Sequence, residues 1–316
     1  MTSTPLRFPG TQGHELAARL EMPAGEPLAF ALFAHCFTCS KDTKAAAYIG
    51  QALSARGIAV LRFDFTGLGM SGGDFADSNF SSNIEDLVAA AGFLRSRHEA
   101  PALLIGHSLG GAAVLAAAAE IPEVRAVATI GAPFDPRHVA HLLEGKAEEL
   151  ASKGEARVDI GGRPFLVRKQ FLDDLEKHAP ADSIAALGKA LLVMHSPRDA
   201  IVGIDNASRI FMAAKHPKSF VSLDDADHLL NRAEDAAYAA EIIAAWSSRF
   251  LAKKPAGEAI EGVRVVESGT GRFAQDIYAG RHRLRADEPV SAGGADSGPS
   301  PYDLVLAGLG ACTAMT

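Results

Sequence analysis

A serine lies between two glycines in the stretch "LLIGHSLGG", where Gly106, Ser108 and Gly110 form a G-x-S-x-G pattern. The apolar run 103–105 before it predicts a buried strand, and the Ala-rich run 109–120 after it predicts a helix. A serine at such a corner, called a nucleophile elbow, exposes its hydroxyl at the end of the strand. Side chains at 106 and 110 would collide with neighbouring elements. We therefore expect Ser108 to be a nucleophile and not merely a helix cap.

A serine hydroxyl needs a base, and the base needs a carboxylate that orients it. Asp199 follows the apolar run of "ALLVMHSPRDAIV", and His228 follows that of "SFVSLDDADHLL". Parallel strands end at one edge of a sheet, so both side chains should meet Ser108 there. His228 is the predicted base among the eleven histidines; His107, for example, is held inside the elbow. Asp227 is the nearest rival acid, but because it directly precedes His228 in the sequence, its side chain is poorly placed to meet the imidazole.

Two of the three cysteines, Cys36 and Cys39, form a C-x-x-C spacing in "LFAHCFTC". A zinc site would need two further ligands nearby, and no second Cys/His pair at metal spacing follows. A redox pair would need an exposed thiol of low pKa at a helix N-terminus, and this alternative stays open. The interpretation we favour is that both cysteines are small apolar fillers.

The elements that must position these residues alternate along the chain. Six short apolar runs predict strands buried on both faces: 30–34, 58–63, 103–105, 124–130, 191–194 and 220–223. Helical patterns lie between or after them at 45–55, 83–97, 109–120, 206–215 and 236–251. Such alternation predicts an α/β domain with a mostly parallel sheet and helices on both faces. An antiparallel hairpin, 6–8 with 14–21, is expected to precede it.

Two segments break this alternation. Residues 134–187 hold helical patterns at 139–153 and 170–178 and a small hairpin around Gly161-Gly162. We expect this insertion to form a lid over the sheet edge; the alternative is an elaborated crossover without a role in access. The charged, Pro-containing segment 254–259 predicts a linker between a domain of residues 1–253 and a second segment, 260–316. That second segment shows alternating strands and then a helix.

Composition excludes several classes of function. The net charge of −7, with scattered basic residues, argues against nucleic-acid and anionic-membrane partners. No apolar run is long enough to span a bilayer, and the N-terminus does not resemble a secretory signal. Three cysteines without such a signal fit a reducing compartment, so the cytoplasm is the expected location.

The chemistry and its setting resemble the α/β-hydrolase family over most of residues 14–253. The stretch "LRFDFTGLGMSGG" adds the family's loop after an early strand, in which Asp64 is implied to be structural. The family's His-Gly-X oxyanion loop corresponds here to His35-Cys36-Phe37. The resemblance therefore implies that the backbone N–H groups of Phe37 and Leu109 form the oxyanion hole.

Residues 260–316 resemble the front part of a different family, the OsmC-like or organic hydroperoxide resistance family. The likeness lies in "ADEPVSAGGADSGPSP" and in "YDLVLAGLGACTAMT", which contains Cys312. It implies a partial α+β segment and association into a homodimer. Members of that family reduce hydroperoxides with two cysteines, and no second cysteine follows Cys312.

These observations predict a serine carboxylesterase that cleaves short-chain acyl esters through Ser108, His228 and Asp199, without metal or organic cofactor. The alternatives are a hydroperoxide reductase that uses Cys312, and a non-catalytic module that dimerises. The order Ser, Asp, His in the chain favours the esterase. Ester, thioester and lactone substrates are not distinguished by the sequence.

Overall fold

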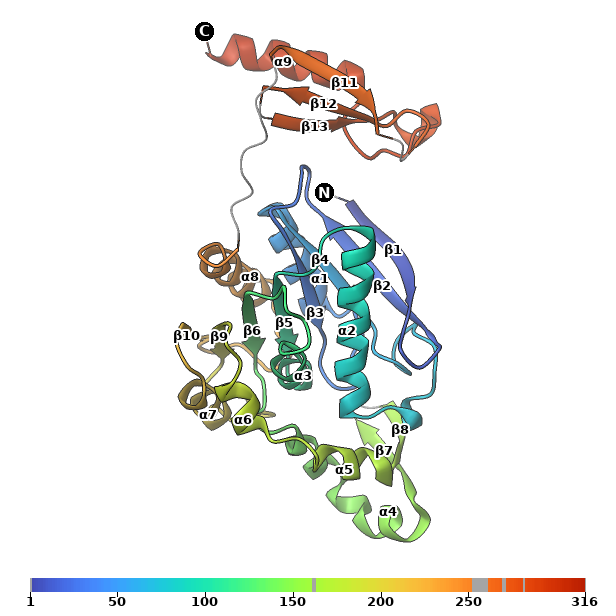
Figure 1. Ribbon diagram of the computed structural model, residues 1–316, viewed down its shortest axis with the longest axis vertical. Helices are drawn as coiled ribbons and strands as arrows, with labels where there is room; N and C mark the ends of the chain where they lie inside the picture. Colours follow the sequence, from blue (N-terminus) through green and yellow to red (C-terminus); the bar gives the residue numbers. More distant parts are fainter. Residues whose placement is uncertain (1, 161–162, 252–260, 269–270, 281, 316) are drawn as a thin grey trace.

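The computed structural model describes residues 2–160, 163–251, 261–268, 271–280 and 282–315 (Figure 1). One sheet of eight strands has the order β1-β2-β4-β3-β5-β6-β9-β10. Its strands are β1 Thr2–Pro9, β2 Glu15–Met22, β3 Ala29–Ala34, β4 Ile58–Phe63, β5 Leu103–His107, β6 Ala126–Ile130, β9 Ala190–His195 and β10 Lys218–Ser222. Within this sheet, β4, β3, β5, β6, β9 and β10 run parallel to one another, and β1 and β2 form the predicted antiparallel hairpin at one edge. The predicted mostly parallel sheet is confirmed.

Helices cover both faces of this sheet (Figure 1). On one face lie α1 Lys44–Ala55 and α8 Ala233–Ser247, and on the other α2 Phe80–Arg97, α3 Leu109–Ala117 and α7 Asp205–Ala213. Alternate residues of one strand serve the two layers: Phe33 packs on the side of α1, and Leu32 on the side of α2. Continuous apolar runs are therefore needed in the central strands. Helix α3 ends three residues earlier than predicted, shortly before Pro122, where the restricted backbone disfavours helix.

The insertion between β6 and β9 is built from short elements. They are a 3₁₀ helix Pro136–Lys146, α4 Ala147–Lys153, β7 Glu155–Ile160, β8 Arg163–Arg168, α5 Lys169–Leu175 and α6 Pro180–Ala185. The predicted hairpin is the antiparallel pair β7–β8, whose Gly161-Gly162 turn lies outside the described residues. A single helix over 139–153 was a wrong prediction, because the first part is 3₁₀; Gly145 has low helix propensity there. Helix α5 ends at Leu175, not at 178, ahead of Pro180.

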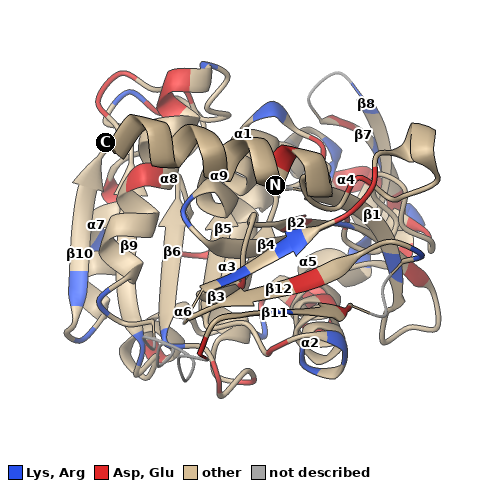
Figure 2. Cartoon of the chain, turned by 90° about the horizontal axis from the view of Figure 1, so that it is seen from above, with Lys and Arg blue, Asp and Glu red and all other residues tan. Residues whose placement is uncertain are grey.

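The C-terminal segment contains the expected antiparallel strands and a helix. They are β11 Val263–Glu267, β12 Gln275–Ala279, β13 His282–Ala286, a 3₁₀ turn Val290–Ala292 and α9 Pro301–Met315. Helix α9 has no Lys or Arg and a single acidic residue, Asp303 (Figure 2), while apolar residues such as Leu309 are exposed. The predicted linker 254–259 lies outside the described residues. Among the described helices, none combines the length and the apolar character that crossing a bilayer requires.

Candidate active site

Ser108 stands at the sharp turn between β5 and α3. Its backbone has φ +55° and ψ −127°, and its N–H donates to the carbonyl of Ile130 at 2.9 Å. A Cβ added to Gly106 would lie 2.3 Å from the carbonyl oxygen of Gly110, and one added to Gly110 would lie 2.4 Å from that of His35. The predicted need for glycine at both positions is therefore confirmed. The tight turn holds the serine hydroxyl above the end of β5.

The structure brings Ser108, Asp199 and His228 together. Along the chain, Asp199 follows Ser108 by 91 residues and His228 follows Asp199 by 29. His228 Nε2 lies 3.0 Å from Ser108 Oγ, and His228 Nδ1 lies 2.7 Å from Asp199 Oδ2. The three residues follow β5, β9 and β10, so the carboxyl ends of parallel strands meet here. A carboxylate, an imidazole and a hydroxyl in one hydrogen-bonded row can activate the hydroxyl for attack.

The Asp199 carboxylate is fixed by its own loop as well as by the histidine. Its Oδ1 accepts the backbone N–H groups of Ile201 and Val202, both at 2.9 Å. Burial alone would raise the pKa of Asp199, but the hydrogen bonds from His228 and from the Val202 N–H outweigh it, and the pKa is lowered. The carboxylate is therefore charged when it orients the imidazole. Asp227 instead accepts the N–H groups of Leu229 and Asn231.

His107, which the sequence placed only inside the elbow, has a further contact. Its ring Nε2 donates to the backbone carbonyl of His228 at 2.6 Å. Burial, followed by the charge of His228, lowers the pKa of His107 to about 4, so the ring is neutral near neutrality. The residue before the serine thus ties down the loop that carries the imidazole. A contact across 121 residues leaves no signal in sequence periodicity.

The loop after β3 lies beside the elbow. His35, Cys36, Phe37, Leu109 and Gly110 all line one small pocket. Among the hydrogen bonds between described residues, none has the backbone N–H of Phe37 or of Leu109 as its donor. His35 holds the loop, since its Nδ1 donates to the carbonyl of Cys36 at 2.8 Å. Two unused N–H groups at such a pocket can receive a negatively charged oxygen.

Cys36 and Cys39 form a disulfide, with their Cα atoms 5.3 Å apart. The interpretation of both residues as unlinked apolar fillers is therefore wrong. The Cys39 N–H donates to the carbonyl of Cys36 at 3.1 Å, and this tight turn brings the two sulfurs within bonding reach. Cys36 is buried and Cys39 is partly exposed. The cytoplasmic location stays a prediction.

The insertion contacts this same loop. The Phe171 ring of α5 packs on Phe37 with the ring centres 5.4 Å apart, and Phe75 packs on Phe37 at 5.6 Å. Arg163 of β8 donates to the carbonyl of Thr38 at 2.5 Å. The insertion therefore reaches the pocket beside Leu109. Whether it opens and closes as a lid stays a prediction.

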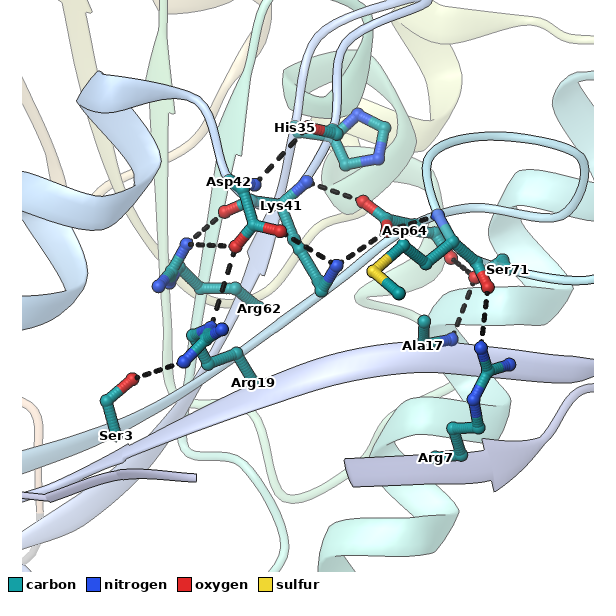
Figure 3. A network of polar contacts seen from close by, with 12 residues as sticks. Ser3, Arg7, Ala17, Arg19, His35, Lys41, Asp42, Arg62, Asp64 and Ser71 are labelled. Atoms are coloured by element: carbon teal, nitrogen blue, oxygen red, sulfur yellow. Dashed lines mark hydrogen bonds and ion pairs between the residues drawn. The ribbon is translucent and has the colours of Figure 1, made fainter. Parts of the chain in front are cut away.

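A buried charge network anchors the far side of the loop (Figure 3). The Lys41 ammonium lies 2.9 Å from Asp64 Oδ2, and the Lys41 backbone N–H donates to Asp64 Oδ1 at 2.6 Å. Asp64 also accepts the N–H of Met70, so it holds a turn as predicted. Beside this pair, Arg62 forms an ion pair with Glu21 at 2.5 Å. All four ionic side chains are at most 4% exposed, so each depends on its partner.

The described residues contain no group of three or more His, Cys, Asp or Glu side chains arranged to hold a metal ion. The chemistry that the hydrogen-bonded row of Ser108, His228 and Asp199 supports follows from its geometry. It is nucleophilic attack by a hydroxyl on a carbonyl carbon.

The parallel sheet, the elbow at Ser108 and the order Ser, Asp, His along the chain are those of a hydrolase of the α/β class. Residues 31–241 match the family model described as "Alpha/beta hydrolase family", and the chain belongs to this family. The match ends before the C-terminal segment, so the OsmC-like resemblance of 260–316 stays a prediction.

Esterases and a thioesterase are among the relatives. The solved esterase domain of a Rhodothermus marinus protein is 53% identical, with a TM-score of 0.67, and covers 80% of this chain and 100% of its own. Mouse (Mus musculus) "Palmitoyl-protein thioesterase ABHD10, mitochondrial" is 29% identical over 154 residues, 46% of this chain. The chain spans about half the length of such curated relatives. The solved mouse "Alpha/beta hydrolase domain-containing protein 10" is 21% identical over 78% of this chain and 99% of its own, with a TM-score of 0.65, and shows the shared fold.

Proposed function

We propose that the chain is a carboxylic ester hydrolase in which Ser108, His228 and Asp199 form a catalytic triad. The observation that carries this proposal is the unbroken row of hydrogen bonds, 3.0 Å from Ser108 Oγ to His228 Nε2 and 2.7 Å from His228 Nδ1 to Asp199. The identity to a solved esterase domain supports it.

In the acylation half of the reaction, Ser108 Oγ attacks the ester carbonyl carbon while His228 Nε2 takes the hydroxyl proton. The carbonyl oxygen becomes an oxyanion and receives the N–H groups of Phe37 and Leu109. Asp199 stabilises the imidazolium that forms. The intermediate collapses as His228 returns the proton to the leaving alkoxide, which departs as an alcohol and leaves an acyl-serine.

Deacylation repeats these steps with water. His228 Nε2 takes a proton from water, and the hydroxide attacks the acyl carbon of the acyl-serine. The same two N–H groups receive the second oxyanion, and the proton passes from His228 to Ser108 Oγ as the carboxylic acid is released. The cycle consumes one ester and one water and releases one alcohol and one carboxylic acid, and Ser108 and His228 return to their starting protonation.

The preference for short acyl groups is part of the proposal, and its support is that the space beside Phe37 and Leu109 is small. This space is lined by aromatic side chains, among them Phe37, Phe75 and Phe171, and its volume is about 10 Å³. That is about the room that one water molecule occupies. The mouse relative is named a palmitoyl-protein thioesterase, so long-chain and thioester substrates are the alternative class to be tested.

The test is a series of p-nitrophenyl esters from acetate to palmitate, with the matching acyl thioesters, on wild type and Ser108→Ala. We expect the highest kcat/KM on acetate or butyrate. Ser108→Ala should lower kcat by about 10⁶, because it removes the nucleophile. The matched control is Ser96→Ala, which removes an exposed hydroxyl from α2 and should leave the rate unchanged.

Two results would contradict the proposal. A folded Ser108→Ala variant that keeps more than about 1% of the wild-type rate would remove the serine from the mechanism. Faster turnover of palmitoyl than of butyryl substrates would reverse the assigned substrate class while leaving the triad in place.

A further inference from the structure

The Cys36–Cys39 disulfide encloses one of the two proposed oxyanion donors. The ring it closes contains only four residues, with Phe37 and Thr38 between the cysteines. Thr38 has φ +61°, a left-handed conformation that is uncommon for a threonine. The bond thus constrains the backbone on both sides of the Phe37 N–H.

The surroundings of the ring are fixed independently of the disulfide. His35 holds the carbonyl of Cys36 on one side, and the buried Lys41–Asp64 pair holds the chain on the other. Arg163 of the insertion holds the carbonyl of Thr38. The Cys36 carbonyl shares its peptide plane with the Phe37 N–H. Opening the disulfide therefore removes one of the restraints on that N–H, while the bonds from His35 and Arg163 remain.

A disulfide that closes so short a loop removes little entropy from the unfolded chain compared with one that closes a long loop. Its main effect is therefore local. The two cysteine residues also differ in burial, since Cys36 is buried and Cys39 is partly exposed. We therefore expect an external thiolate to attack at Cys39.

We propose that Cys36 and Cys39 are a thiol–disulfide exchange site that positions the Phe37 N–H, so that reduction by a dithiol lowers the hydrolytic rate. This inference rests on the proposed esterase function. A thiolate of the reductant attacks Cys39 Sγ, the S–S bond breaks, and Cys36 leaves as a thiolate that takes up a proton. The second thiol of the reductant then attacks the mixed disulfide, which releases Cys39 as a thiol and the reductant as its own disulfide.

The size of the effect follows from the role of the donor. Removal of one oxyanion donor lowers kcat by about 10²–10³, so a donor that is displaced but not removed should cost about 10-fold to 100-fold. KM should change little, because the ground-state ester makes weak use of the oxyanion hole. A change confined to kcat separates positioning of the donor from general damage to the pocket.

The experiment uses the full chain and p-nitrophenyl butyrate. Thiol titration of the denatured chain should give one thiol before treatment with dithiothreitol and three after it. The reduced enzyme should show the lower kcat, and reoxidation should restore the original rate. The double variant Cys36→Ser/Cys39→Ser should match the reduced enzyme and ignore dithiothreitol, whereas Cys312→Ser should respond as wild type does.

The outcomes separate this inference from the proposal beneath it. Three thiols before reduction, or equal kcat in the two states of an active enzyme, would overturn the exchange site and leave the esterase untouched. A fall in kcat that Cys312→Ser abolishes would also overturn it. A chain that hydrolyses no ester in either state would remove the proposed function and this inference together.

Discussion

Replacement of Asp199 by asparagine should trap His228 in an unproductive tautomer. In the native site, Asp199 Oδ1 accepts two backbone N–H groups at 2.9 Å, and Oδ2 accepts the Nδ1–H of His228 at 2.7 Å. Only the amide oxygen of an asparagine can accept the two backbone donors, so its NH₂ group must face His228. The ring must then accept at Nδ1 and carry its proton on Nε2, where it cannot take the proton of Ser108.

The wrong tautomer should lower kcat by about 10⁴. At 1.36 kcal/mol for each factor of ten, this is about 5 kcal/mol of transition-state stabilisation. KM should stay within a few-fold, because the buried Asp199 carboxylate contacts His228 and its own loop and not the Ser108 hydroxyl. The assay is steady-state hydrolysis of p-nitrophenyl butyrate, with Tm measured alongside it. Tm should not fall greatly, since a neutral amide is cheaper to bury than a carboxylate.

The matched control is Asp227→Asn, at the rival acid next to His228. The Asp227 carboxylate accepts the N–H groups of Leu229 and Asn231, and an amide oxygen can accept both, so the rate should be unchanged. Our account of the site is refuted if Asp199→Asn, folded to the same Tm, keeps more than about 10% of wild-type kcat. If Asp227→Asn instead lowered kcat by the factor expected for Asp199→Asn, Asp227 would be the acid that orients His228.

Three further predictions concern packing, pH and association. Gly110→Ala should abolish hydrolysis or folding, since its Cβ would lie 2.4 Å from the His35 carbonyl; a soluble, active variant with unchanged Tm would contradict this. Burial raises the pKa of Asp86 to about 6, above about 3.9 in an unfolded chain, so the folded protein binds the extra proton and its stability falls as pH rises from about 4 to 6. Because Asp86→Asn does not titrate, the stability of this variant relative to wild type should rise between about pH 4 and 6 by up to about 3 kcal/mol, read from the difference in Tm. A difference in Tm that does not change with pH would refute the raised pKa of Asp86. We propose that the C-terminal segment forms a homodimer, so light scattering should give the mass of a dimer for the full chain and of a monomer for a version ending at residue 254. Monomers in both cases would exclude the homodimer, and rapid hydroperoxide loss that depends on Cys312 would favour the reductase.

Local patterns predicted the sheet and the elbow well. The apolar run before Ser108 and the glycines around it are properties of neighbouring residues, and the carboxyl ends of two further runs brought Asp199 and His228 to the same edge. Parallel-sheet geometry supplied the step from separate segments to one site.

Contacts between distant segments were not accessible in the same way. The tie from His107 to the carbonyl of His228 and the bond from Arg163 to the loop carbonyl of Thr38 depend on how the segments pack. The disulfide was not predicted for a different reason. A C-x-x-C spacing allows a bond only when the turn brings the Cα atoms within reach, and the spacing alone does not specify the turn.

The buried charge network has a consequence for how this chain can change over evolutionary time. A mutation that replaces Lys41 or Arg62 alone leaves the buried carboxylate of Asp64 or Glu21 without its cation. Loss of Asp64 or Glu21 alone leaves the buried cation with the exposed Asp42 carboxylate as its ionic partner. We therefore expect single substitutions there to lower the stability of the fold before they affect the rate. Because Asp64 also accepts the backbone N–H groups of Lys41 and Met70, joint replacement of Lys41 and Asp64 still loses the turn. A deep mutational scan should therefore find Arg62 and Glu21 more tolerant of joint than of single replacement, and Asp64 intolerant in both cases.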